Sequence, residues 1–293
     1  MTILHFTVPP MLHYIVSGLH YFEAGHRHIG RHHIGVFDLL VVKSGCLYMG
    51  EEELRFEVQA GEMLILRPGN HHFGTMDCSE RTTYYWLHFH TGGCWSVSAD
   101  EYEPLKGGSP MGSELQNSQL FEVRPFTLSL PQYAALRQPQ IVQSLLDQLI
   151  QLGPSAHLSA TPLSQQLLFQ EVIQHLTASL NSERSTPSRA CAEQTASYLR
   201  THYREDITAK RLGEHLNFHP VYIARCMGKE YGCSPMEYLL HYRIQQSKLL
   251  LMQTDYPVAR IAEEVGFNHV PYFSSSFAKI EGMSPRKYRQ QFS

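Results

Sequence analysis

The sequence predicts a multidomain protein with an all-β N-terminal half of jelly-roll type, a helical hairpin, and an all-α C-terminal domain. From about Phe22 to Phe89, short segments rich in Val, Leu, Phe and Tyr alternate with Gly or Pro-Gly turns, which is typical of antiparallel strands. After Pro139 the apolar residues recur at helical spacing. Over about the last 100 residues, one helical pattern occurs twice. A chain of 293 residues is long enough for two domains.

The N-terminal strands are expected in four segments, FDLLVVKSG, CLYMGEEELRFEVQAG, EMLILRPGNHHFG and TTYYWLHF. Closely spaced strands with tight turns favour a small antiparallel barrel or jelly roll. The stretch from Gly92 to Ser118 is rich in Gly, Ser, Pro and acidic residues and predicts a long surface loop. The segment FEVRPFTLSL then predicts one more strand that closes the sheet.

Two amphipathic helices are expected next. Their apolar positions are Ile141, Leu145, Leu146, Leu149 and Leu152, then Leu163, Leu167, Ile173, Leu176 and Leu180. Either these stripes pack only on each other and on the sheet, or part of the stripe pairs with a second copy in a homodimer. The following NSERSTPSRA has the composition of a linker. The expected domains are therefore residues 1–135, a hairpin at 136–181, a linker at 182–190 and a C-terminal domain at 191–293.

A repeated unit dominates the C-terminal domain. LGEHLNFHPVYI aligns with IAEEVGFNHVPYF at an offset of 49, which becomes 50 from Ile223 and Phe273 onward. Asn217 and Gly266 occupy the same place in the two copies and suit the left-handed conformation that ends a helix. Each copy therefore predicts a helix-turn-helix, whose second helix can enter the major groove of DNA.

One long helix is expected between the two copies. The stretch from Ser234 to Glu237 is a capping box with proline at the first helical position, and the apolar pattern then runs to Gln253. About 19 residues give a length of roughly 28 Å, close to the ~34 Å of one DNA turn. Such a spacer would place two recognition helices in successive major grooves.

Composition and charge are those of an ordinary soluble protein, with 43% hydrophobic and 17% charged residues. The N-terminal MTILHFTVPP lacks the features of a signal peptide, and no apolar run approaches the roughly 18 residues of a membrane helix, so we expect a cytoplasmic protein without a membrane partner. The six cysteines show no C-x-x-C spacing and are expected as reduced thiols. Residues 190–293 carry a net charge of +3 and residues 1–189 a net charge of −6, so the C-terminal part is better suited to a polyanion.

The segment from ITAKRLGEHL to GMSPRKYR resembles the DNA-binding domain of AraC/XylS-type transcription regulators over about 90 residues. The most specific matches are IAEEVGF, YFSSSF and GMSPRKYR. The N-terminal half, with its RPG-x-HH turn and YYWLHF strand, is similar to the cupin-like ligand-binding domain of sugar-responsive members. The resemblance implies a regulator, most commonly an activator, that binds double-stranded promoter DNA as a homodimer. It also implies a small-molecule effector such as a sugar, and RNA polymerase as a further partner.

Carried over residue by residue, the resemblance predicts the DNA-facing positions. These are Val221, Ala224 and Arg225 on the first recognition helix, and His269, Val270, Pro271, Ser274 and Ser275 on the second. Arg225 alone has a bidentate donor suited to guanine, and its alternative role is a phosphate contact. Lys229, Lys279, Arg286 and Lys287 are candidate phosphate partners. The sequence departs from the family at Ser275, where arginine is usual, and at Gly228 and Ala278, near positions that lysine often holds.

The same resemblance predicts the ligand-binding residues Arg31, His72, Phe73, Tyr84 and Trp86. Arg31 would hold sugar hydroxyls, Trp86 would offer an apolar face to a sugar ring, and Tyr84 would offer a hydroxyl. A small-molecule pocket needs mostly apolar walls and a few placed polar groups. The alternative is that Phe73, Tyr84 and Trp86 are barrel core.

The 18 histidines raise a second function class, a metal-dependent cupin enzyme with a helical appendage. Cupin enzymes hold a metal with H-x-H, a carboxylate and a later histidine, and here Asp38 and His72 have suitable spacing. The H-x-H is missing, because the positions read Arg31 and His33, or His32 and Ile34, and His26-x-His28 lies too far upstream. A third possibility is a scaffold whose helices bind protein. No phosphate-binding loop, H-E-x-x-H or G-x-S-x-G motif occurs, so we expect neither an enzyme nor a cofactor.

Overall fold

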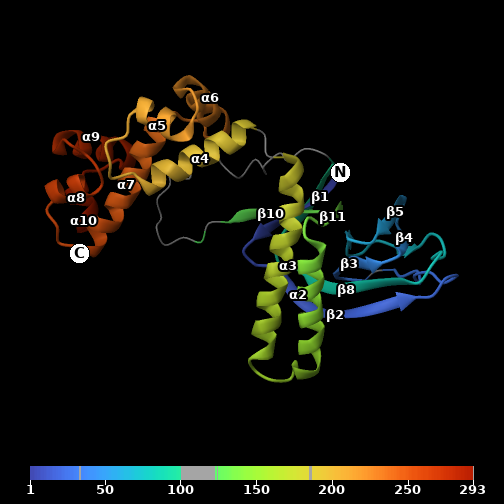
Figure 1. Ribbon diagram of the computed structural model, residues 1–293. Coiled ribbons are helices and arrows are strands. Elements are labelled where there is room, and N and C mark those ends of the chain that lie inside the picture. Colours follow the sequence, from blue (N-terminus) through green and yellow to red (C-terminus); the bar gives the residue numbers. More distant parts are fainter. Residues whose placement is uncertain (33, 100–122, 124, 185–186, 293) are drawn as a thin grey trace. The chain divides into compact units, whose positions relative to one another are not determined.

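A computed structural model describes residues 1–32, 34–99, 123, 125–184 and 187–292, with the side chains of 181–184 left aside. The described chain divides into two compact units (Figure 1). Unit 1 contains the residues before 100 and residues 123–184, and unit 2 contains the residues after 186. Of the loop predicted from Gly92 to Ser118, the first part instead forms a strand, Trp95–Ala99, and the part from residue 100 onward lies outside the described residues.

Unit 1 contains three antiparallel sheets. A five-stranded sheet has the order β11-β6-β3-β8-β2, and two three-stranded sheets have the orders β10-β1-β9 and β5-β4-β7. The strands are β1 Thr2–Val8, β2 His13–Phe22, β3 Phe37–Ser44, β4 Cys46–Glu51, β5 Leu54–Gln59, β6 Glu62–Leu66, β7 His72–Gly74, β8 Thr82–His90, β9 Trp95–Ala99, β10 Phe126–Pro131 and β11 Tyr133–Ala135. The four predicted strand segments and the closing strand at FEVRPFTLSL all contain observed strands.

Strand β3 is buried on both faces because it lies in the middle of the five-stranded sheet. Side chains alternate along a strand, so Leu39 and Val41 join a core beneath the helices, while Leu40 and Val42 join a second core on the opposite face. Asp38 belongs to that second face and lies opposite His88 of β8. This alternation places a carboxylate among apolar side chains.

The hairpin consists of α2 (Pro139–Leu152), a short 3-10 turn η1 (Gly153–Ser155) and α3 (Thr161–Arg184). Five of the ten predicted apolar positions join the core with the sheet, namely Leu145, Leu146, Leu149, Ile173 and Leu176. Ile141, Leu163 and Leu167 are instead 43%, 66% and 58% exposed. The segment with linker composition is largely helical, because α3 continues to Arg184 and α4 begins at Pro187. Proline suits the first turn of a helix, where its missing N–H costs nothing.

Unit 2 is helical in all its described elements. They are α4 Pro187–Thr201, α5 Ala209–Leu216, α6 Pro220–Tyr231, α7 Pro235–Gln253, α8 Val258–Glu264, α9 Val270–Glu281 and α10 Pro285–Gln290. Helix α7 supplies Tyr238 and Leu239 to a core with α4, α5 and α6, and it supplies Ile244 and Leu251 to a core with α8, α9 and α10. One helix therefore joins two packed groups. Among the described residues, no helix combines the length and apolarity that crossing a membrane requires.

The turn residues adopt the conformations that the sequence predicts. Asn217 has φ of 56° and ends α5, and Gly266 has φ of +87° after α8. The Ser234 hydroxyl accepts a hydrogen bond from the Glu237 amide at 3.2 Å, which caps α7. Helix α7 is 19 residues long and ends at Gln253, so its predicted length and end are confirmed.

Candidate nucleic-acid interface and ligand cavity

Helix α6 separates its residues cleanly between core and solvent. Ile223, Cys226 and Met227 are buried, because they lie on the face that packs against α4 and α7. The helix begins where the His219 ring accepts a hydrogen bond from the Val221 amide at 3.3 Å. The opposite, exposed face carries Val221, Ala224, Arg225, Gly228 and Lys229. The residues expected to face DNA on this helix therefore share one accessible surface.

The Arg225 guanidinium lies over the ring of Tyr222, with its central carbon 5.5 Å from the ring centroid. Within the described part of the chain, it makes no ion pair with a carboxylate. Lys229 lies 3.9 Å from the Glu230 carboxylate, a distance at which an exposed pair contributes little. Both cations are thus available to an external acceptor.

Helix α9 presents a second exposed face. His269, Val270, Pro271, Ser275 and Lys279 are exposed, and Ser274 is half-buried. The Ser275 hydroxyl donates to the Tyr272 carbonyl at 3.0 Å, so this side chain is bonded to its own helix. Arg286 and Lys287 are exposed on α10.

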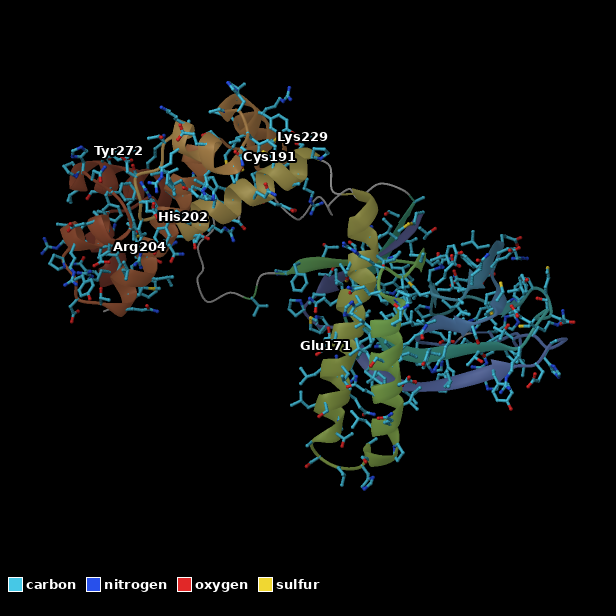
Figure 2. The ribbon with its side chains drawn as sticks, in the orientation of Figure 1. Glu171, Cys191, His202, Arg204, Lys229 and Tyr272 are labelled. Carbon is cyan, nitrogen blue, oxygen red and sulfur yellow. The ribbon has the colours of Figure 1, made fainter. Side chains whose placement is uncertain are left out.

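Tyr272 was missed by the sequence analysis, and its side chain is 57% exposed on α9 (Figure 2). The phenol offers both a hydrogen-bond donor and an acceptor beside the residues expected to face DNA. Tyr222 and Tyr272 directly precede the aligned pair Ile223 and Phe273 in the two copies.

Helix α7 is tied to the elements on both sides of it. The Arg243 guanidinium donates to the carbonyls of Tyr203 and Glu205, each at 2.7 Å. Lys248 is fully buried and its ammonium donates to the Glu281 carboxylate of α9 at 2.7 Å. These charge-assisted bonds fix the segment after α4 and the end of α9 to the same helix.

A cavity of about 300 Å³ opens on one face of the five-stranded sheet in unit 1. It is lined by His20, Phe22, His28, Ile29, Arg31, Asp38, Tyr84, Trp86 and His88. Three of the five predicted ligand residues, Arg31, Tyr84 and Trp86, thus line one cavity. Tyr84 and Trp86 also pack in the core beneath the cavity, so each of them both lines the cavity and belongs to the core.

The other two predicted ligand residues lie differently. Phe73 is not among the residues lining the cavity; its ring packs against Gly50, stacks on His71 at 4.7 Å between centroids, and lies beneath the Arg55 guanidinium. Neighbours in a strand point to opposite faces, so His72 and Phe73 of β7 cannot both face the cavity. His72 is buried on the cavity side of β7, with its ring centroid 6.0 Å from that of His28, although it is not a lining residue itself.

Asp38 is the acidic residue among those lining the cavity, and it is only 3% exposed. Its Oδ2 atom lies 3.6 Å from His88 Nε2, and its Oδ1 atom has no hydrogen-bond partner among the described residues. His28 donates from Nδ1 to the Ile29 carbonyl at 2.7 Å, which leaves Nε2 as an acceptor. Burial lowers the pKa of His28 and of His72, so both rings are neutral at pH 7. Burial also raises the pKa of the Tyr84 phenol.

The described histidines and acids do not converge on a metal site. No group of three or more His, Cys, Asp or Glu side chains in the described ranges is placed to hold a metal ion. His33, one of the positions considered for the H-x-H, lies outside the described residues. The metal-enzyme interpretation therefore gains no support from the residues that the structure describes.

Comparison with known proteins shows the family. A protein-family profile described as a helix-turn-helix domain matches residues 212–291. The HTH-type transcriptional regulator YisR of Bacillus subtilis is 38% identical over 287 residues, which cover 97% of this chain and 96% of that protein. The arabinose operon regulatory protein of Escherichia coli is 25% identical over 236 residues, covering 80% of this chain and 73% of that protein.

Among solved structures, the C-terminal domain of AraT, a response regulator from Geobacillus stearothermophilus, is 34% identical. The match covers 37% of this chain and 88% of that one, with a TM-score of 0.35. The match to YisR extends along nearly the whole of both chains. The helix-turn-helix profile and the arabinose regulator indicate the same family. The chain belongs to the AraC family of helix-turn-helix transcriptional regulators.

Proposed function

We propose that this DNA-binding transcription regulator is ligand-responsive and reads promoter DNA with two helix-turn-helix units. The first unit is α5 with α6, the second is α8 with α9, and α7 spaces them. Residues 191–293 would form the DNA-binding domain, residues 1–135 a cupin-like sensor, residues 136–181 a dimerising hairpin, and residues 182–190 the junction. Under this proposal the protein acts as an activator, with RNA polymerase as the partner that it recruits.

The observation that carries the DNA-binding proposal is the exposed face of α6. A recognition helix must bury one face in its domain and leave the other free for base edges and phosphates. Helix α6 meets both conditions, and Arg225 stands on its exposed face without a competing carboxylate among the described residues. On α9 the corresponding face offers the Tyr272 phenol, the His269 imidazole, hydroxyl and methyl groups and the Lys279 ammonium, but no guanidinium. We therefore expect the first unit to supply most of the base-specific contacts.

The test is recovery of bound genomic DNA fragments by the purified protein, followed by affinity measurements at a stated salt concentration. Arg225→Ala should weaken binding to the recovered site by about 1–3 kcal/mol and relax its sequence preference. Arg55→Ala in unit 1 removes the same charge from an exposed position and serves as the control. Equal affinities of the wild type and Arg225→Ala for the recovered site would contradict the assignment of Arg225.

The cavity in unit 1 supports the sensor part of the proposal. It combines aromatic walls with a buried carboxylate, as expected of a site for a small polar molecule such as a sugar. An effector would alter DNA binding by preferring one of two arrangements of the protein, and its coupling free energy would equal the change in DNA affinity. DNA titrations with and without candidate effectors measure this coupling.

A further inference from the structure

The Asp38 carboxylate identifies the kind of group that the cavity binds. A carboxylate buried to this degree is costly unless it is paired or hydrogen-bonded. The ring of His88 lies beside it, but the 3.6 Å between His88 Nε2 and Asp38 Oδ2 is too long for a hydrogen bond. The Oδ1 atom has no partner at all in the described part of the chain. The Oδ1 atom of Asp38 is therefore open to a hydrogen-bond donor from a ligand. A positively charged donor would also compensate the charge of the carboxylate.

Two imidazoles lie near this carboxylate, and of the two only His28 lines the cavity. His28, which lines the cavity, uses Nδ1 to donate to a backbone carbonyl, so its Nε2 is left as an acceptor. His72 is buried, and neither of its ring nitrogens has a hydrogen-bond partner among the described residues. In a neutral imidazole one nitrogen is an acceptor. A protonated amino group has three N–H donors and can serve several such acceptors together.

The remaining walls are aromatic. Phe22 and Tyr84 stack with 5.6 Å between ring centroids, and the ring of His20 meets Tyr84 edge-on at 5.8 Å. Trp86 completes this set of rings, which line the same cavity as Asp38. Aromatic faces attract organic cations, and a box of them around a carboxylate is a suitable site for an ammonium group. Arg31 also lines the cavity, but its side chain is exposed, so water screens its charge and it is free to bind an oxygen of the ligand.

We propose that the cavity binds an aminated small molecule of the amino-sugar class, with its ammonium group held by Asp38 and its ring against Trp86. This inference rests on the proposed sensor role and narrows the effector from sugars in general to those that carry a protonated amine. Asp38 is then the residue that determines specificity. A neutral sugar could donate a hydroxyl to Asp38 but would leave the buried charge uncompensated.

The experiment uses pairs of probes that differ only in an amine for a hydroxyl. The full-length protein is titrated by calorimetry at pH 7 with D-glucosamine and D-glucose, and with cyclohexylamine and cyclohexanol. Each amine should bind at least about tenfold more tightly than its hydroxyl partner, because a charge-assisted hydrogen bond replaces a neutral one. Equal affinities within a pair, or no amine binding up to about 20 mM, would overturn the proposal.

Variants assign the effect to the carboxylate. Asp38→Asn should lower amine affinity at least about tenfold and leave hydroxyl affinity within about twofold. Asp77→Asn, which changes an exposed carboxylate of the same unit, should change neither. Unaltered amine binding by Asp38→Asn would reject the assignment. If circular dichroism shows that Asp38→Asn is unfolded, the wild-type comparison within each probe pair still tests whether the cavity prefers an amine to a hydroxyl.

Two further measurements distinguish amine binding from metal binding and from a failure of the proposed regulator function. Titration with Zn²⁺ and Ni²⁺ tests the competing ligand class, and metal binding lost in Asp38→Asn without any amine binding would overturn the amine proposal. DNA affinity is measured on the same preparation. Intact DNA binding with no amine binding would reject this inference alone, whereas loss of specific DNA binding would reject the proposed regulator function.

Discussion

Gly266 is subject to two separate constraints. Its φ of +87° lies in the left-handed region, where a side chain is disfavoured. A Cβ atom placed there would also lie 2.7 Å from the Tyr203 carbonyl oxygen and 2.9 Å from that of Arg204. The turn between α8 and α9 thus fits closely against the segment that follows α4. Gly228, on α6, has ordinary helical geometry and open space around it.

We therefore expect opposite effects from one substitution at these two glycines. Gly266→Ala should destabilise unit 2 by about 2–3 kcal/mol, because it adds backbone strain and a steric clash. Gly228→Ala should stabilise it by about 0.5–1 kcal/mol, because alanine loses less entropy in a helix. Urea unfolding followed by far-ultraviolet circular dichroism measures both. Both tryptophans, Trp86 and Trp95, lie in unit 1, so their fluorescence should be unchanged. A Gly266→Ala protein as stable as the wild type would contradict the close fit.

The positions of some functional side chains follow from the sequence alone, and those of others do not. The exposure of Arg225 could be predicted because helical period alone separates it from buried Ile223 and Met227. Family resemblance placed Phe73 in the pocket with His72, although neighbours in a strand point to opposite faces; which of the two lies on the cavity side depends on how β7 packs. The role of Asp38 in the cavity also depends on which strands flank β3, and the sequence does not state that pairing.

Among the elements of unit 2, α7 joins the helix pair α5–α6 to the helix pair α8–α9. The capping serine and the apolar pattern predicted its bounds, because both signals are local in sequence. Its contacts are not local. Lys248 and Glu281 are 33 positions apart in the sequence, and no local pattern in either segment predicts that they pair. This buried pair sets the position of α9 against α7.

Breaking this pair from one side should be costly. Lys248→Met leaves the Glu281 carboxylate buried without its cation and should destabilise unit 2 by about 3–5 kcal/mol. Replacing both residues, as Lys248→Met with Glu281→Leu, should recover most of that loss, because no unpaired charge remains. Thermal unfolding followed by circular dichroism compares the two variants. A double variant as unstable as the single one would show that the pair is not the cause.

For the whole molecule, the proposed dimer would form through the α2–α3 hairpin of unit 1. Leu163 and Leu167 lie one helical turn apart on α3 and are exposed, whereas Leu176 and Leu180 further along the helix are buried. Large apolar side chains at adjacent positions of an exposed helix face are typical of a surface that pairs with another protein. This favours the second of the two interpretations of the predicted apolar stripe.

Replacing Leu163 and Leu167 together by lysine should convert a dimer into a monomer, because like charges would face each other at the interface. Light scattering across a range of protein concentrations gives the mass directly. Leu54→Lys, at an exposed leucine of β5, is the control and should leave the mass unchanged. A wild type that is monomeric at every concentration would exclude this dimer.

The N-terminal strand β1 lies between β9 and β10, so Leu4 pairs with Leu130 across more than 120 positions of the chain. Contacts this distant in sequence form slowly, because a long loop must close before they give any stabilisation. During synthesis, the start of the chain must wait until β10 has left the ribosome. Unit 2 contains mainly local helical contacts and can fold soon after it emerges. Once each unit has fully emerged from the ribosome, unit 2 is therefore expected to need less time to fold than unit 1.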